Sequence, residues 1–227
     1  EWHPSRDPHL AARFSRDAPE GKAVCKADLQ SRLGLPTLPE VPLLAVISRL
    51  TPQKGMDLVV ETLDAVLSLD TQFVLLGTGD PPLHAALEAL QRRHPRQVGI
   101  RLGFDVALSH QIEAGADIFL MPSRYEPCGL NQMYSLAYGT VPLVRATGGL
   151  DDTVQPFDPD TGLGNGFKFA EESPAALLAT VRRAVALYRQ PAQWKRLVQN
   201  AMACDFSWDR SARENDRLYQ EIIARRR

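Results

Sequence analysis

Cysteine and net charge are both scarce in this sequence, and each shortage excludes a class of protein. The chain has 227 residues but only three cysteines, Cys25, Cys128 and Cys204, which are odd in number and far apart. That pattern argues against a disulfide framework and favours a reducing compartment such as the cytoplasm. The net charge of −1 provides no overall field toward nucleic acid or an anionic membrane, so we expect neither as a partner.

Long hydrophobic runs and metal-ligand spacings are also missing. No run approaches the roughly 20 apolar residues of a membrane span, and the opening EWHPSRDPHL has no signal-peptide pattern. The five histidines are scattered, and FDPDTGLGNG (157–166) lacks the closing acidic residue of a calcium loop, so we expect no metal. The opening also lacks an initiator methionine, from which we expect a piece of a longer protein.

What the sequence does contain is a regular alternation of short apolar runs and amphipathic segments. Strand-sized runs separated by segments of helical periodicity are typical of βαβ units, and runs without polar alternation suit strands buried on both faces. The sequence therefore predicts an α/β fold with a Rossmann-like parallel sheet of about six strands flanked by helices. The apolar runs lie at 43–48, 72–77, 98–103, 117–122, 141–146 and 166–170.

Three regions are expected along the chain. Residues 1–40 are polar and rich in proline, and we interpret them as an arm with one helix at about 21–33. Residues 41–203 hold the predicted sheet and most helices, and 204–227 form a final helix. Pro174 and Pro191 suit first-turn positions of helices, and Ser207 suits an N-cap.

Ligands of open parallel sheets bind beyond the carboxyl ends of the strands, so the loops after the strands are the segments to inspect. The first, SRLTPQKG (48–55), holds Arg49 and Lys54. A guanidinium fork and an ammonium converging on one strand end suit a diphosphate. On spacing alone, two solvated surface cations are slightly favoured over a diphosphate site.

The segment PSRYEPCGLNQM (122–133) is the second candidate. If Pro127 starts a helix, the amides of Gly129, Leu130 and Asn131 are helix N-terminal donors for an anion. Glu126 at that end then either accepts hydrogen bonds from sugar hydroxyls or stabilises the helix dipole. The residues alone leave these two roles evenly balanced.

Three neighbouring features have less specific interpretations. Cys128 is interpreted as a small packing or backbone-contact residue rather than a thiolate nucleophile, because no histidine or aspartate supports nucleophilic chemistry. Phe104 either stacks on a base or belongs to the core. The segment ATGGLDDT (146–153) either approaches a ligand or forms a tight turn, and the turn is favoured.

Taken together, several segments resemble bacterial glycogen synthase and plant starch synthase over nearly the whole chain. They are SRLTPQKGMDL, LGTGDP, GADIFLMPSRYEPCGLNQMYSLAYGTVPLVRATGGLDDTV and NGFKF. The resemblance implies the C-terminal, donor-binding half of a retaining GT-B glucosyltransferase, in which two Rossmann-like domains face across a cleft. Such an enzyme transfers glucose from ADP-glucose to the non-reducing end of an α-1,4-glucan, without a cofactor, in the cytoplasm or in a plant plastid.

The resemblance also implies roles for individual residues. Arg49 and Lys54 would bind the diphosphate and stabilise the leaving group, and Glu126 would bind the glucose hydroxyls. The amides from Cys128 through Gly129 and Leu130 to Asn131 would bind sugar and phosphates. Phe104 stands where the family usually has a tyrosine beside the adenine. Tyr134, assigned to the nucleotide-sugar site, stands where many relatives of this fold carry a second glutamate.

The resemblance has consequences for the isolated chain. The family's other domain carries most acceptor contacts, and the family's last helix crosses back to pack on that domain. We therefore expect this chain to bind ADP or ADP-glucose weakly and not to transfer glucose. The alternatives are another GT-B enzyme, such as a sucrose synthase, or a non-catalytic nucleotide-binding or interaction module.

Overall fold

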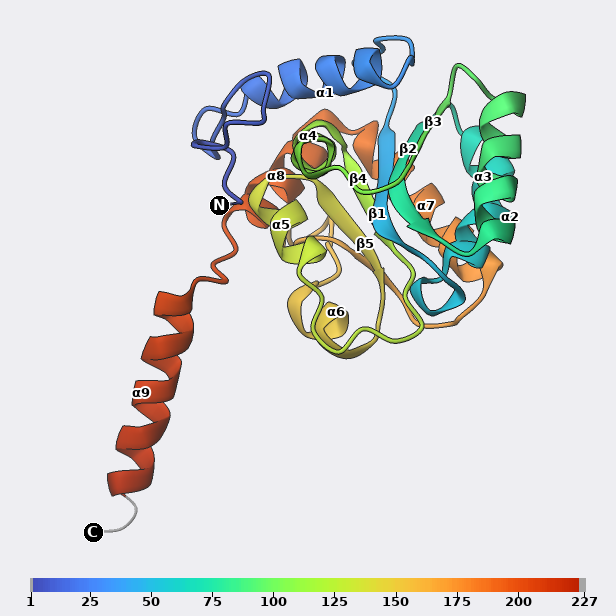
Figure 1. Ribbon diagram of the computed structural model, residues 1–227. Helices are drawn as coiled ribbons and strands as arrows, with labels where there is room; N and C mark the ends of the chain where they lie inside the picture. The colour runs from blue at the N-terminus through green and yellow to red at the C-terminus, as the bar shows by residue number, and fades with distance from the viewer. Residues whose placement is uncertain (1, 225–227) are drawn as a thin grey trace.

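The computed structural model describes residues 2–224, and its centre is a parallel sheet of six strands (Figure 1). Each predicted apolar run forms one strand, so the predicted fold class is confirmed. The strands are β1 (Leu43–Leu50), β2 (Gln72–Gly79), β3 (Val98–Leu102), β4 (Ile118–Met121), β5 (Val141–Arg145) and β6 (Phe167–Phe169).

Helices connect the strands and continue after the last one. Prolines stand in the first turn of α3, α7 and α8, where the missing N–H costs no hydrogen bond. The helices are α1 (Gly21–Arg32), η1 (Pro52–Lys54), α2 (Met56–Leu67), α3 (Pro81–Arg93), α4 (Val106–Gly115), α5 (Asn131–Ala137), α6 (Gly148–Thr153), α7 (Pro174–Tyr188), α8 (Pro191–Met202) and α9 (Trp208–Ala224).

The strand order places the carboxyl ends of β1 and β4 next to each other. The order across the sheet is β3-β2-β1-β4-β5-β6, and every paired neighbour is parallel. The chain therefore builds outward in one direction from β1 to β3 and in the other from β4 to β6. The crevice at such a reversal is where open α/β sheets bind ligands.

Both faces of the sheet are covered by helices. Leu44 and Val46 of β1 belong to a core cluster with residues of α2, α3, α7 and α8. Leu43 and Ala45, which point to the other face, pack in a second cluster with residues of α1 and α4. This two-sided burial accounts for the absence of polar alternation in the strands.

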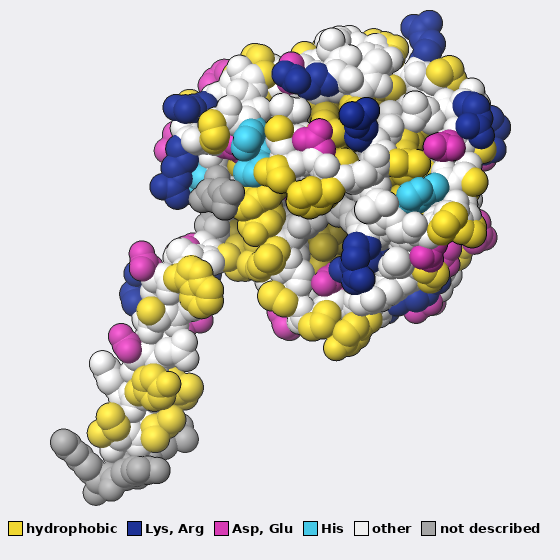
Figure 2. All heavy atoms as spheres, in the orientation of Figure 1, with side chains coloured by type: hydrophobic (Ala, Val, Ile, Leu, Met, Phe, Trp, Pro, Cys, Tyr) yellow, Lys and Arg dark blue, Asp and Glu magenta, His cyan; other side chains and the backbone are white. Residues whose placement is uncertain are grey.

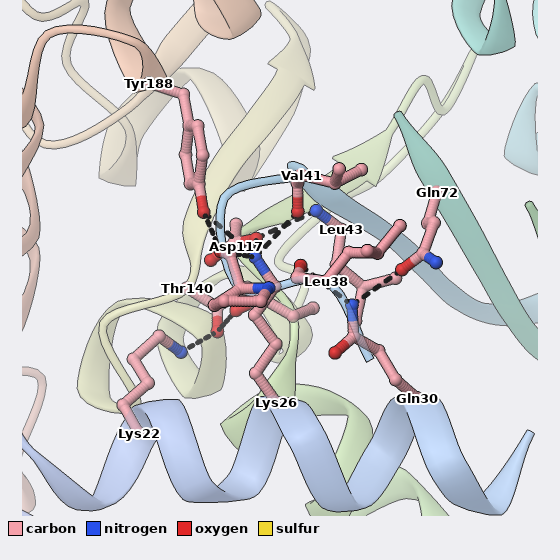
Figure 3. Close-up of polar contacts among 12 residues, drawn as sticks. Lys22, Lys26, Gln30, Leu38, Val41, Leu43, Gln72, Asp117, Thr140 and Tyr188 are labelled. Atoms are coloured by element: carbon pink, nitrogen blue, oxygen red, sulfur yellow. Dashed lines mark hydrogen bonds and ion pairs between the residues drawn. The ribbon is translucent and has the colours of Figure 1, made fainter. Parts of the chain in front are cut away.

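Helix α1, in the predicted arm, packs on α4. It is also bonded to residues at the N-terminal ends of β1 and β4, which are the ends opposite the crevice (Figure 3). The ammonium group of Lys26 contacts a carboxylate oxygen of Asp117 at 2.6 Å, and it donates to the carbonyl of Val41 at 2.7 Å and to the hydroxyl of Tyr188 at 2.9 Å. The same Asp117 oxygen accepts from the backbone N–H of Leu43 at 2.8 Å. This buried network joins the arm to the starts of β1 and β4.

Helix α9 extends away from the rest of the chain (Figure 1). No residue of α9 is buried, and the exposed fraction of Trp208 is 90%. Hydrophobic side chains gather along it in Figure 2. Its exposed hydrophobic residues also include Leu218, Tyr219, Ile222 and Ile223. The predicted N-cap is present, because Ser207 Oγ accepts from the N–H of Arg210 at 3.3 Å. Residues 225–227 of the predicted final helix lie outside the described residues.

We expect removal of α9 to leave the stability of the remaining domain unchanged. Because α9 buries none of its side chains, a chain ending at Asp205 loses no core contact. The expected change in melting temperature is below about 3 °C, as for loss of surface contacts worth under about 0.5 kcal/mol. Thermal unfolding followed by circular dichroism measures this. A drop of about 10 °C or more would instead mean that α9 packs on the domain in solution.

Candidate functional site

A cavity of about 350 Å³ opens at the crevice between the ends of β1 and β4. Its walls come from β1 and the loop after it, from the end of β2, and from the loops that follow β3 and β4. Because these loops all leave carboxyl ends of strands, residues that are far apart in sequence meet here. Most of the predicted site residues line this cavity: Arg49, Lys54, Phe104, Glu126, Gly129, Leu130 and Asn131.

Lys54 and Glu126 form an ion pair inside the cavity. The Lys54 ammonium contacts Glu126 Oε2, and the side chains are only 20% and 11% exposed. Ser123, which is buried, donates from its hydroxyl to the same carboxylate oxygen at 3.3 Å. A cation suited to phosphate and an acceptor suited to hydroxyls therefore lie in direct contact.

Two glycines of the ATGGLDDT segment hold the backbone around Glu126. A Cβ on Gly148 would lie 2.3 Å from the carbonyl oxygen of Glu126, and one on Gly149 would lie 1.9 Å from that of Cys128. The N–H of Gly149 donates to the carbonyl oxygens of Glu126 and Pro127, each at 3.2 Å. Because these two residues have no Cβ, the segment can lie directly against the loop of residues 122–130, called the Glu126 loop below. This contact explains the tight turn favoured from the sequence.

Glu126 is not a helix cap, and the expected start of the helix is wrong. Helix α5 begins at Asn131, so Pro127 lies in the preceding loop rather than in the first turn. The N-cap position is occupied by Leu130, and no side chain caps this helix. The chain between Pro127 and Leu130 includes Gly129 with φ +72°, a left-handed conformation that interrupts the helix. The Glu126 carboxylate instead binds Lys54 and Ser123.

The residues at the start of α5 line the cavity and carry backbone donors. Within residues 2–224, no acceptor contacts the N–H groups of Gly129, Leu130 or Asn131. The Asn131 side chain donates to the carbonyl of Ile47 at 3.0 Å, which fixes the start of α5 against the end of β1. Its side chain thus serves to position the loop, and Asn131 also lines the cavity.

Arg49 and Phe104 bring a second cation and an aromatic ring. Arg49 is exposed, and no carboxylate pairs with it in the part of the chain that the structure describes. Phe104 is 91% exposed, so the alternative that it belongs to the core is wrong. An exposed ring at the rim of a polar cavity is available for stacking on a flat ligand.

Two predicted site residues do not line the cavity. Cys128 is exposed, and its thiol contacts only the neighbouring Gly129 carbonyl oxygen at 3.5 Å among the described atoms. Tyr134 stacks on Trp2 of the arm with ring centroids 4.3 Å apart. Trp2 also stacks on His110, at 3.7 Å. The structure therefore uses Tyr134 to hold the arm against α5.

Sequence reasoning assigned no role to Arg124, although it stands two residues before Glu126. Its guanidinium binds both carboxylate oxygens of Asp57, at 2.6 and 2.8 Å. This hydrogen bonding lowers the pKa of Asp57 and raises that of Arg124. Only the tertiary contact reveals the pair, because Asp57 lies 67 residues earlier in α2. The only indication of its role in the sequence was its position in PSRYEPCGLNQM, two residues before Glu126.

Residues 2–224 contain neither a metal-binding cluster nor a membrane-spanning helix. Among residues 2–224, no three His, Cys, Asp or Glu side chains are grouped so that they could hold a metal ion. No helix in that range combines the length and the hydrophobicity needed to cross a membrane.

Comparisons of sequence point to one family. Residues 35–201 match the family model of glycosyl transferases group 1. Glycogen synthases of Anaeromyxobacter sp. (strain Fw109-5) and Myxococcus xanthus (strain DK1622) are 54% and 52% identical over 99% of this chain. The chain spans about half the length of these curated relatives, 47% and 46%.

Comparisons of structure agree. The catalytic domain of starch synthase IV from Arabidopsis thaliana, bound to ADP and acarbose, matches 98% of this chain with a TM-score of 0.89 and 38% identity, over 47% of its own length. A sucrose-phosphate synthase from Thermosynechococcus elongatus matches 87% of this chain, and 49% of its own, with a TM-score of 0.63 and 23% identity. The second likeness concerns the fold alone.

Proposed function

This chain belongs to the glycosyl transferases group 1 family, and we propose that it is the donor-binding half of a retaining glucosyltransferase of glycogen synthesis. The donor is ADP-glucose, the acceptor is the non-reducing end of an α-1,4-glucan, and no resident cofactor takes part. The similarity to glycogen synthases over 99% of the chain supports this assignment. ADP in the related starch synthase structure supports the choice of nucleotide.

The observation that carries the proposal is the Lys54–Glu126 pair in the crevice between β1 and β4. A nucleoside diphosphate glucose carries its phosphates and its sugar hydroxyls on adjacent groups. A cation in contact with a carboxylate matches that succession, because the ammonium suits phosphate oxygens and the carboxylate accepts from hydroxyls. A site for a nucleotide alone would not require the carboxylate.

The cations explain how the site would assist transfer. When the bond between glucose and the diphosphate breaks, negative charge grows on the leaving phosphate. Lys54 and Arg49 line the same cavity and would stabilise that charge more strongly as it develops. Glu126 would hold the glucose hydroxyls, the amides of the 129–131 loop would bind sugar and phosphates, and Phe104 would stack on the base.

The isolated chain is proposed to bind the nucleotide without transferring glucose. It spans 46–47% of the length of the curated glycogen synthases, so the parts of those enzymes that it does not cover are proposed to be needed for transfer. A measurable rate of glucan elongation by the purified 227-residue chain would contradict this part of the proposal.

Calorimetric titration of ADP and UDP into the chain, beside a Phe104→Ala variant, tests the site. We expect saturable ADP binding, tighter than UDP, that Phe104→Ala weakens by about 5- to 10-fold, the value of one stacking contact. Because Phe104 is exposed, its replacement is expected to leave the melting temperature unchanged.

Two results would contradict this proposal, the first in whole and the second only in the role of Phe104. Absence of saturable binding to either nucleotide would favour an interaction module instead. Equal affinity of the wild type and of Phe104→Ala, with ADP bound, would remove Phe104 from the site and leave the cations in place.

A further inference from the structure

Arg124 lies outside the cavity but contacts the segment that carries Lys54. Its Nη1 donates to the carbonyl oxygen of Pro52, the first residue of η1, and to Asp57 Oδ1 at 2.6 Å. Its Nη2 donates to Asp57 Oδ2 at 2.8 Å, and its Nε to Glu172. Four of the five guanidinium N–H groups are therefore used, and three of these bonds reach Pro52 and Asp57, which lie before and after Lys54 in the chain.

The backbones of the two loops are also joined at Arg124. Its N–H donates to the carbonyl of Gln53 at 2.9 Å, one residue before Lys54. Gly55, one residue after Lys54, has φ +68°, and a Cβ there would lie 2.1 Å from the carbonyl oxygen of Pro122. The Lys54 turn and the Glu126 loop thus touch along their backbones on both sides of Lys54.

A second arginine fixes the other side of the Glu126 loop. Arg145, at the end of β5, donates from Nε to the carbonyl of Ser123 at 2.8 Å and from Nη2 to that of Arg124. The loop is therefore held from β5 at its carbonyls and from η1 at its N–H. The Arg124 side chain joins this loop to both η1 and α2.

We propose that Arg124 is a positioning residue that holds Lys54 and Glu126 at the separation needed to bind a nucleoside diphosphate sugar. This inference rests on the proposed function. The turn η1 is a single turn with no buried residue, so it has little packing of its own to orient Lys54. Arg124 supplies that order from outside the cavity without touching the ligand.

Only arginine fits this role. The two bonds to Asp57 and the bond to Pro52 require a planar fork that reaches a carboxylate and a carbonyl together. Lysine keeps the charge, but its three N–H donors lie on one nitrogen and cannot reproduce the planar fork. Arg124→Lys therefore separates loss of geometry from loss of charge.

The test is ADP affinity and melting temperature of the 227-residue chain with Arg124→Lys, compared with Arg93→Lys. Arg93 is a matched control because it also forms an ion pair, with Asp64 at 2.6 Å, but lines no part of the cavity. We expect Arg124→Lys to weaken ADP binding by about 5- to 10-fold, and Arg93→Lys not to change it. If Arg124→Lys folds poorly, Asp57→Asn replaces it in the test, because asparagine keeps the shape of the partner side chain. Asp57→Asn is also expected to weaken ADP binding.

A double-mutant cycle identifies the group through which Arg124 acts. If it works by placing Lys54, Arg124→Lys should add little to the loss caused by Lys54→Met, because the residue being positioned is already gone. Multiplicative losses would overturn the proposal, as would unchanged affinity of Arg124→Lys while the wild type binds ADP. In either case the proposed donor site would stand.

Hydrogen exchange decides the question even if the chain binds no nucleotide. The amide N–H groups of Lys54, Gly55 and Arg124 are bonded to Thr51, Pro52 and Gln53. We expect them to exchange at least about fivefold faster in Arg124→Lys than in Arg93→Lys, with other amides unchanged. Unchanged exchange at these three amides would overturn the role of Arg124. Failure of the wild type to bind ADP would count against the proposed function alone.

Discussion

Replacement of Lys54 by methionine is expected to weaken ADP binding by about 10- to 100-fold, the value of one hydrogen bond to a charged group. Methionine keeps the apolar stem but removes the ammonium that faces both the cavity and Glu126. The same change leaves a carboxylate, 11% exposed, without its cation. Because burial of an unpaired charge is costly, we also expect the free energy of unfolding to fall by about 1–2 kcal/mol.

Arg49→Met provides the informative comparison. Arg49 is exposed and pairs with no carboxylate among the described residues, so its loss should weaken ADP binding without lowering stability. Lys195→Met on α8, outside the cavity lining, should change neither quantity. Calorimetric titration gives the affinities, and urea unfolding gives the free energies. Wild-type affinity in Lys54→Met would remove the ammonium from the nucleotide site and with it the main support for the proposed function.

Glu113→Gln is expected to change how stability depends on pH. Glu113 is buried on α4, and Ser135 Oγ donates to its Oε2 at 2.8 Å, while its Oε1 has no partner among the described atoms. Burial raises the pKa of this carboxyl from 4.5 to about 8. The folded protein therefore keeps the proton over a pH range in which the unfolded chain loses it.

The sign of the effect follows from this difference. A folded-state pKa above the unfolded value contributes stability that is fully present below pH 4.5 and is lost as the pH rises through about 8. Between pH 5.5 and 8 the wild type should lose on the order of 3 kcal/mol relative to Glu113→Gln, whose amide does not titrate.

Urea unfolding of both proteins across that pH range measures the difference. Desolvation lowers the pKa of the half-buried Lys22 to about 8, so measurements above pH 8 would mix the titrations of the two groups. Glu61→Gln, an exposed carboxylate on α2, is the matched control and should track the wild type at every pH. A difference between wild type and Glu113→Gln that stays constant with pH would show that Glu113 is ionised in the fold.

The elements of the fold could be predicted from local pattern because both faces of the sheet are buried. Runs such as LLAVIS and QFVLLG are continuous in hydrophobicity, and proline or glycine punctuates them, so strands and helices were recognised without knowing their neighbours. The start of α5 was misplaced because Pro127 has the residue type of a first helical turn. The left-handed Gly129 after it is a property of backbone conformation, which residue type indicates only weakly.

The roles of the site residues were harder to predict because they depend on which loops meet. Glu126 could not be distinguished from a helix cap while its distance from Lys54, 72 residues earlier, was unknown. Phe104 could not be assigned to core or surface for the same reason. Arg124 was overlooked because its partner Asp57 is identified only by contact.

By itself, the sequence determined the alternation of strands and helices, the two-sided burial of the sheet and the resemblance to a family, because each depends on residue type and spacing along the chain. The tertiary structure alone decided that β1 and β4 are neighbours. Their adjacent carboxyl ends place the Lys54 turn against the Glu126 loop, with Arg124 joining them. The physical reason is that strand order is set by how the helices pack on both faces, and the separation of two loops in sequence does not report it.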